Sequence, residues 1–301
     1  MGHELRSRLS AVTAANLVFG IVVREFWPLL RVLLLPSSAT AVVLYLSLKA
    51  YLLKLIAFIP SGNPQTASLA LGALAAGVFL SMFLAAVAIS SVTDLVLLKR
   101  RNPRWFNFNI RRQEWRLYAA YLRFLLVAAG FLTAIYVLSA LVLPALTTSA
   151  ATVGIVSASL TIGGCYWLFA RLGFLIAPIV ARSSGTVLRK AVHQGSGDFG
   201  RNLALVVLLS FPGLVIEIAG EHLFRLGSGP TRVEITLPLI YYARALEHRL
   251  MEFVFLSSLS AFLTLVLFTT GAIVCYRDRI FSDSPAPVSS RPVATLDSAP
   301  V

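Results

Sequence analysis

Charged residues divide the chain into long apolar stretches, most of which have the length of a helix that crosses a membrane. Such a helix needs about 20 apolar residues, within a usable range of about 17–25. The pattern predicts an all-α fold, a polytopic transmembrane helical bundle of about six spans. The third and fourth spans form a tight hairpin around Pro144. The predicted spans are residues 32–48, 67–92, 124–143, 152–170, 203–216 and 253–276.

The fifth stretch, residues 203–216, is the weakest of the six. It is short, and Pro212-Gly213 interrupts it. A kinked helix that crosses the membrane and a re-entrant segment that dips in and returns both fit this pattern. We expect a crossing, because the distribution of basic residues along the chain otherwise fails to alternate between the two sides.

The N-terminal segment shows a helical repeat of a different kind. Apolar residues recur at three- and four-residue steps, as at Phe19, Val23 and Phe26, while Arg24 belongs to the polar counterpart. This pattern predicts an amphipathic helix on the membrane surface, with a bend toward the membrane at Trp27-Pro28. The alternative is a simple extension of the first span.

Composition supports a protein that lies mostly in lipid. The 301 residues are 57% apolar and 13% charged, with a mean hydropathy of +0.81. A soluble domain carries about 25% charged residues, so this composition excludes an ordinary soluble enzyme, a disordered protein and a disulfide scaffold. Cys165 and Cys275 both lie in or beside long apolar stretches, away from any zinc-binding spacing.

The net charge of +13 sets the predicted orientation. With six spans, 18 of the 26 basic residues fall in segments on one side of the membrane, the N-terminal side. Cytoplasmic segments keep such residues, so both termini are predicted to be cytoplasmic and the chain to be an integral membrane protein. The predicted organisation is an interfacial segment (residues 1–31), a six-helix transmembrane domain (32–276) and a disordered cytoplasmic tail (277–301).

The loop after the second span alternates cations with aromatic residues. Arginines hold phosphate groups and tryptophans favour the headgroup layer of a bilayer. Such a pattern also occurs in proteins that bind single-stranded nucleic acid, but spans on both sides favour lipid headgroups and exclude nucleic acid as a partner. The predicted headgroup contacts are Arg104, Trp105, Arg111, Arg112, Trp115, Arg116 and Arg171.

A second polar group gathers around the predicted outer segment. Carboxylates and imidazoles of this kind can hold a metal ion or transfer a proton. The spacing is not the HExxH of a metalloprotease, however, and Arg225 and Arg249 are close enough in sequence to pair with the carboxylates. We therefore expect ion pairs at the rim of the bundle, with no metal, no cofactor and no catalytic residues. The group consists of Glu217, Glu221, His222, Glu247, His248 and Glu252.

Three stretches around the fourth span resemble those of a known group of membrane proteins. They are residues 170–178 (ARLGFLIAP), 188–195 (LRKAVHQG) and 198–203 (DFGRNL). In this respect the chain is similar to uncharacterised bacterial YciC-like proteins and to the membrane domain of some glycerophosphodiester phosphodiesterases. Ala191-Val192 stands where Ala-Trp is usual, and Gly197-Asp198 where Gly-Asn is usual. The resemblance implies a six-helix inner-membrane protein without known catalytic residues, and the phosphodiesterase activity is not carried over.

Together these patterns predict a non-enzymatic inner-membrane protein. Its basic cytoplasmic face is expected to bind anionic lipid headgroups, with a role as a membrane scaffold for a membrane-protein partner or a second copy of the chain. The alternative is a small-solute transporter or channel, in which Pro212-Gly213 and the outer Glu217 and Glu221 form the mouth.

Overall fold

The computed structural model describes residues 9–61, 64–98, 112–146, 150–182, 187–227 and 250–283, and these residues form helices and no strand. The predicted all-α fold is therefore confirmed. The helices are α1 (Ala11–Arg24), α2 (Phe26–Ser61), α3 (Pro64–Val96), α4 (Arg112–Leu146), α5 (Ala150–Leu168), α6 (Ile176–Arg182), α7 (Val187–Gly197), α8 (Phe199–Gly227) and α10 (Leu250–Asp283), with a π-helical turn η1 (Phe169–Gly173) between α5 and α6.

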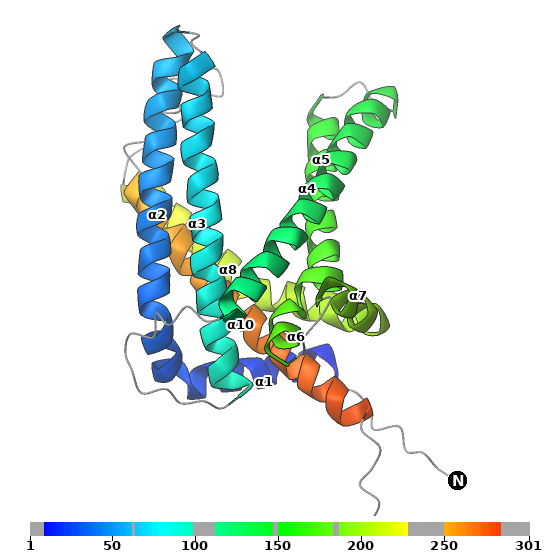
Figure 1. Ribbon diagram of the computed structural model, residues 1–301. Helices are drawn as coiled ribbons and strands as arrows, with labels where there is room; N and C mark the ends of the chain where they lie inside the picture. The colour runs from blue at the N-terminus through cyan, green and yellow to red at the C-terminus, as the bar shows by residue number, and fades with distance from the viewer. Residues whose placement is uncertain are drawn as a thin grey trace, which may run out of the picture.

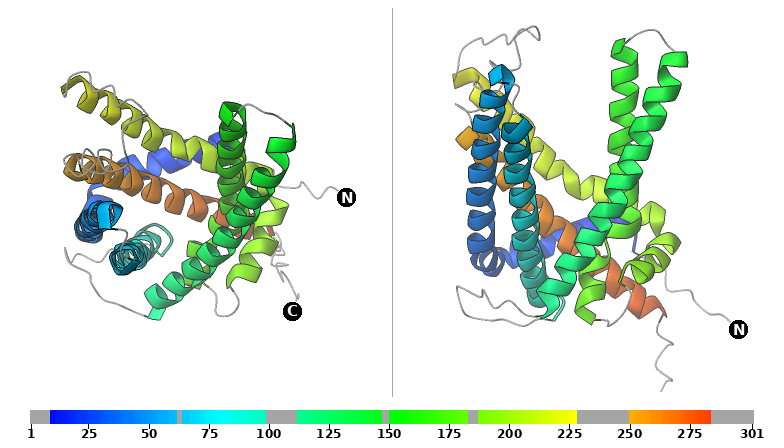
Figure 2. Two further views of the ribbon diagram at one scale, coloured as in Figure 1. Left: turned by 90° about the horizontal axis from the view of Figure 1, so that it is seen from above. Right: turned by 45° about the horizontal axis from the view of Figure 1, so that its top comes forward.

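Two helical hairpins diverge from a common end of the molecule. The α2–α3 hairpin and the α4–α5 hairpin point the same way and spread apart, while α8 and α10 run obliquely beside them (Figure 1). The helix α1 lies across the end at which the hairpins meet, beside α8 and α10 (Figure 2). We call this end the base; it holds α1, the starts of α2 and α4, and all of α6 and α7.

Six of the described helical segments are long and apolar enough to cross a membrane. They are Phe26–Lys54, Pro64–Val96, Arg112–Ser139, Thr152–Arg182, Phe199–Gly220 and Leu250–Ile280. Large side chains on their outer faces stay uncovered by protein: Leu126, Leu138 and Ile155 are 66%, 60% and 68% exposed. Leaving each such side chain in water forgoes about 1.5–3 kcal/mol of burial energy, whereas lipid removes this cost. The chain is thus an integral membrane protein.

Each predicted span corresponds to a helical segment of the structure, but several of these segments are longer than predicted. The fifth segment forms one continuous helix across Pro212, which favours a crossing over a re-entrant loop. The fourth extends to Arg182 rather than ending at residue 170, because α5 continues through η1 into α6. In η1 the amide of Phe174 donates to the carbonyl oxygen of Phe169 at 2.8 Å, a bond across five residues that widens the helix.

The core lies at the base, where α6 is enclosed by other helices. Ile176, Leu205 and Leu267 are fully buried there, and each comes from a different helix. A second apolar cluster joins α2, α3 and α10 through Leu33 and Val92, among others. Because helix association in lipid depends on close packing, these contacts rather than the splayed ends of the hairpins hold the bundle together.

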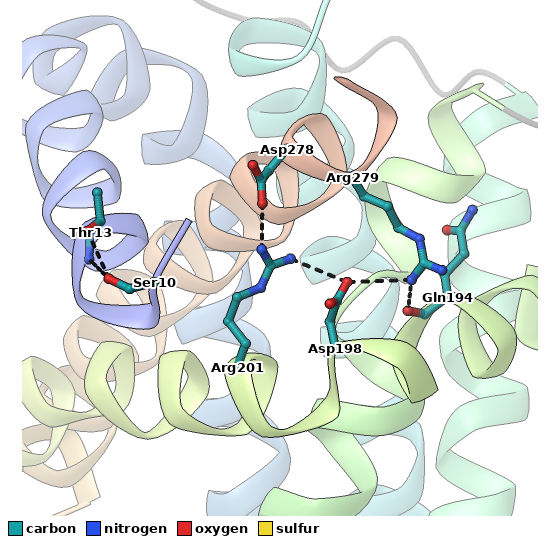
Figure 3. Close-up of polar contacts among 7 residues, drawn as sticks. All are labelled: Ser10, Thr13, Gln194, Asp198, Arg201, Asp278 and Arg279. Atoms are coloured by element: carbon teal, nitrogen blue, oxygen red, sulfur yellow. Dashed lines mark hydrogen bonds and ion pairs between the residues drawn. The ribbon is translucent and has the colours of Figure 1, made fainter. Parts of the chain in front are cut away.

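The helix α1 has two apolar faces. Ala14, Ala15 and Val18 are buried against the core, whereas Val12 and Phe19 are exposed on another side of the helix. Ser10 caps the helix by accepting a hydrogen bond from the amide of Thr13 at 3.1 Å (Figure 3). The bend that the sequence placed at Trp27-Pro28 lies two residues earlier, at Glu25, between α1 and α2. The predicted separate N-terminal helix is therefore present, and it packs on protein with its small residues.

Small residues explain how two helix pairs approach closely. A Cβ atom on Gly77 would lie within 2.3 Å of the Ser47 side chain of α2, so α3 needs a glycine there. Gly72, on a neighbouring stripe of α3, meets nothing within 4 Å. Similarly, Gly164 contacts Phe131 and Ile135 of α4 while Gly163 faces open space. Small residues alone therefore do not identify the contact side of a helix.

Candidate functional site

The predicted headgroup residues that the structure describes lie at two separate places. Arg112, Trp115 and Arg116 occupy the first turns of α4, whereas Arg104, Trp105 and Arg111 are outside the described residues. Arg112 and Trp115 are exposed, and the indole of Trp115 packs against the ring of Phe83 with centroids 5.0 Å apart. Trp115 is thus held by α3 at the start of α4, with part of its surface open.

Arg171 occupies a different position from the one that the sequence suggested. It was expected to close the fourth span, but it lies in η1, within a continuous helical stretch. Its guanidinium group stacks over the ring of Trp167 at 5.4 Å, a cation–π contact. Its backbone carbonyl lies against Gly195 of α7. Arg171 and the start of α4 therefore have different neighbours and form two sites rather than one.

The predicted outer cluster is not assembled by the described residues. Glu247 and His248 lie outside them, and of Glu221 only the backbone in α8 is described. His222 and Glu252 are exposed, and no group of three His, Cys, Asp or Glu residues with metal-binding geometry occurs in the described part of the chain. The predicted rim ion pairs with Arg225 and Arg249 involve side chains that the structure does not describe.

Glu217 differs from the other members of the predicted outer cluster, because it lines a cavity between helices of the bundle. The cavity has a volume of about 420 Å³, within the range of about 300–1,000 Å³ that is typical of ligand sites. Its walls come from α3, α4, η1, α6, α8 and α10. The lining residues are Ile89, Tyr121, Phe169, Phe174, Ala177, Glu217, Ser260, Ala261, Thr264, Leu265, Phe268 and Thr269.

The contact between α8 and α10 explains why Glu217 faces the cavity. A Cβ atom on Gly213 would lie 2.4 Å from the Thr264 hydroxyl oxygen, and one on Gly220 would lie 2.3 Å from a methyl carbon of Leu256. Residues four and seven positions apart share one face of a helix, so Glu217 lies on the same face of α8 as these two glycines. It is nevertheless exposed, so the cavity is open rather than enclosed at this residue.

Ionic contacts join three helices at the base. The guanidinium group of Arg201 lies 2.5 Å from the carboxylate of Asp278 and 3.5 Å from that of Asp198 (Figure 3). Arg279 also approaches Asp198, at 3.6 Å, and donates a hydrogen bond to the backbone carbonyl of Gln194 in α7. These contacts tie the end of α10 to the starts of α8 and the end of α7. The network is not apparent in the sequence, because its two halves, residues 194–201 and 278–279, are far apart along the chain.

A buried carboxylate in α4 was also missed. Glu114 is 6% exposed, and its Oε1 accepts a hydrogen bond from the Ser90 hydroxyl of α3 at 3.1 Å. The available signal was helical spacing. Glu114 stands three and seven residues before Leu117 and Tyr121, which both pack toward the core, so this spacing places its side chain on the inner face of α4.

No protein-family model matches the chain, and no characterised protein or solved structure is significantly similar to it. The resemblance to YciC-like proteins therefore rests on sequence alone, chiefly on residues 170–178, 188–195 and 198–203 and also on the loop at residues 105–116. In the structure the first three of these stretches form parts of η1, α6, α7 and the first turn of α8, which pack together at the base.

Proposed function

We propose that the protein binds anionic lipid headgroups through its base, which faces the cytoplasm of a bacterial inner membrane. The separation of charge along the fold carries this proposal. Residues 55–93 and 124–170, which form most of the two hairpins, contain no charged residue. In contrast, Arg112, Arg182 and Arg189 are exposed on elements that belong to the base. Basic residues remain on the cytoplasmic side, where anionic headgroups attract them.

The apolar residues of the base support the same orientation to lipid. The exposed apolar stripe of α1 and the exposed ring of Trp115 suit the boundary between headgroups and acyl chains, where aromatic residues are enriched. Arginines at this level hold phosphate groups through bidentate hydrogen bonds. The exposed surface of the base thus carries both apolar and basic residues. A surface that faces only water does not need such apolar residues.

The test compares lipid retention between two double variants with the same loss of charge. The base variant is Arg112→Gln with Arg189→Gln. The control is Lys49→Gln with Lys54→Gln, whose exposed lysines lie more than 20 residues, roughly 35 Å, up α2 from the base. Each protein is reconstituted in mixed phosphatidylglycerol and phosphatidylcholine, released into detergent and measured by native mass spectrometry.

Each basic residue near an anionic surface contributes about 1 kcal/mol. The base variant is therefore expected to lose about 2 kcal/mol of preference for phosphatidylglycerol, roughly a 30-fold change in relative retention. The control variant is expected to retain the wild-type preference. Equal retention by the base variant and the wild type would overturn the proposal.

A further inference from the structure

The cavity beside Glu217 combines one carboxylate with apolar and hydroxyl-bearing walls. Of its twelve lining residues none is Lys or Arg, and Glu217 is the one acidic residue among them. Glu217 lies within the membrane-spanning part of α8, three residues before its end at Gly220. An ionisable group within a span is costly in lipid, and such groups commonly mark the path or site of a charged ligand.

No described residue forms an ion pair or hydrogen bond with Glu217, although its face of α8 is in contact with α10. The neighbouring hydroxyl of Ser260 donates to the backbone carbonyl of Gly213 at 3.2 Å, so its hydrogen is already engaged. The Thr264 hydroxyl lies against Gly213 as well. The carboxylate of Glu217 thus faces a cavity whose walls supply no cation.

The lining of the cavity extends along α10, from a polar end near Glu217 to the aromatic rings of η1. Its lining residues on this helix run from Ser260 to Thr269, a rise of about 13 Å. Glu217, Ser260 and Thr264 make one end polar. At the other end the rings of Phe169 and Phe268 lie 5.2 Å apart, with Phe174 beside Phe169 at 6.3 Å.

The π-helical turn η1 forms the aromatic end. Phe169 and Phe174 are five residues apart, joined by the wide hydrogen bond of the π-turn, and both line the cavity. In a regular α-helix residues five apart diverge by about 140°, so the wider turn brings the two rings closer to one side. Single π-turns often occur at functional sites, and this one shapes the cavity wall.

We propose that this cavity binds an organic ammonium ion with an apolar tail. The Glu217 carboxylate pairs with the ammonium group, and Phe169, Phe174 and Phe268 enclose the tail. Charge complementarity selects the headgroup, since an anionic amphiphile would place two negative charges together without a cation nearby. The carboxylate end of this site is separate from the headgroup surface of the base, because Ser260 stands 18 residues, about 27 Å along α10, before Asp278.

The ammonium group can come from a free lipophilic amine or from the headgroup of phosphatidylethanolamine, and two arms of one experiment distinguish these sources. In the first arm, the protein in phosphatidylglycerol nanodiscs is titrated with dodecylammonium, and with dodecanol as the neutral analogue of equal length. In the second arm, nanodiscs contain phosphatidylethanolamine and phosphatidylglycerol without free amine, and native mass spectrometry measures how much phosphatidylethanolamine stays bound.

Both arms compare the wild type with Glu217→Gln and Glu252→Gln. Glu252 is an exposed carboxylate of α10 that does not line the cavity, so its variant is a matched loss of charge. A charge-assisted contact is worth about 1.5–3 kcal/mol, so Glu217→Gln is expected to lower the affinity for ammonium between about tenfold and a hundredfold. Glu252→Gln is expected to bind as the wild type does, and dodecanol is expected to be insensitive to either change.

Loss of ammonium binding by Glu217→Gln in either arm supports the site, and the arm in which it occurs identifies the source of the ammonium group. The proposal is overturned when neither ammonium ligand binds the wild type, or when Glu217→Gln binds these ligands as well as the wild type does. It is also overturned when dodecanol binds the wild type with the same affinity as dodecylammonium. A thermal unfolding curve of Glu217→Gln that matches the wild type shows that the variant is folded. A second variant, Thr264→Val, leaves the volume of the cavity unchanged but removes a hydroxyl group from its wall. It is expected to lower the affinity for ammonium less than Glu217→Gln does.

Discussion

The guanidinium group of Arg201 lies 2.5 Å from the carboxylate of Asp278, although 77 positions separate the two residues in the chain. The pair joins the first turn of α8 to the last turns of α10. Their side chains are 13% and 15% exposed, so the contact is shielded from water on most sides. The position of α8 on α10 therefore depends on charge at the base as well as on apolar packing.

Asp278→Asn is expected to destabilise the protein by about 2 kcal/mol. An exposed ion pair is worth about 1 kcal/mol or less, and removing one partner of a fully buried pair costs about 3–5 kcal/mol. This pair lies between these limits. Thermal unfolding in detergent measures the loss, and a double-mutant cycle with Arg201→Gln isolates the coupling between the two side chains. A coupling energy of zero would contradict the inferred role of this contact.

Gly195→Ala is expected to loosen α7 from η1. A Cβ atom there would lie 2.4 Å from the carbonyl oxygen of Arg171, and a backbone atom cannot move aside as a flexible side chain can. Strain of this kind costs about 1–3 kcal/mol. The expected result is a lower unfolding temperature and faster tryptic cleavage after Arg189 in α7.

Gly200→Ala is the matched control, because a Cβ atom on this helical glycine meets nothing within 4 Å. Alanine is favoured over glycine in a helix by about 1 kcal/mol, so this variant is expected to be at least as stable as the wild type. If the two alanine variants unfold at the same temperature, the inference that the close contact between Gly195 and Arg171 requires a glycine is wrong.

Most of the fold could be predicted from charge-free lengths, because lipid imposes a minimum length on each span. The ends of the spans are harder to predict, because polar residues near helix ends form contacts with residues that are distant in sequence. The sequence predicts that the sixth span ends just before Arg277, yet α10 continues past this residue. Its guanidinium group donates to the carbonyl oxygens of Val96 and Leu97 at 2.7 and 2.8 Å, which closes the end of α3.

The candidate cavity could not be predicted, although one of its residues was singled out. Glu217 was grouped with Glu221 and His222 because they are close in sequence. Its place in the fold follows instead from the spacing of Gly213, Glu217 and Gly220, which puts the carboxylate on the contact face of α8. The π-turn at Phe169 has no sequence signature, and without it the aromatic end of the cavity is not apparent.

Spin labels on α1 are expected to distinguish its lipid-facing side. Val12, Phe19 and Val23 share one exposed stripe of the helix, whereas Gly20 lies on a different exposed side. In a chain with Cys165→Ser and Cys275→Ser, a label at Phe19→Cys should collide more with oxygen, which concentrates in lipid. A label at Gly20→Cys should collide more with a water-soluble nickel complex. Equal accessibility at the two positions would contradict an interfacial α1.

The orientation of the bundle gives a further prediction, which labelling of single cysteines can check. Ser68 is exposed in the first turns of α3, at the end of the α2–α3 hairpin away from the base, and Arg189 is exposed in α7 at the base. If basic residues stay in the cytoplasm, a membrane-impermeant maleimide added to intact cells should label Ser68→Cys. Arg189→Cys should react only after the membrane is permeabilised.

Both variants carry Cys165→Ser and Cys275→Ser, so that each chain has one thiol. Labelling of both variants in permeabilised cells controls for the reactivity of the two positions. The reverse pattern would put the arginines of the base outside the cell, where the cytoplasmic surface potential does not act on them. The proposed binding of inner-leaflet lipids would then fail, while the ammonium site beside Glu217 does not depend on this orientation.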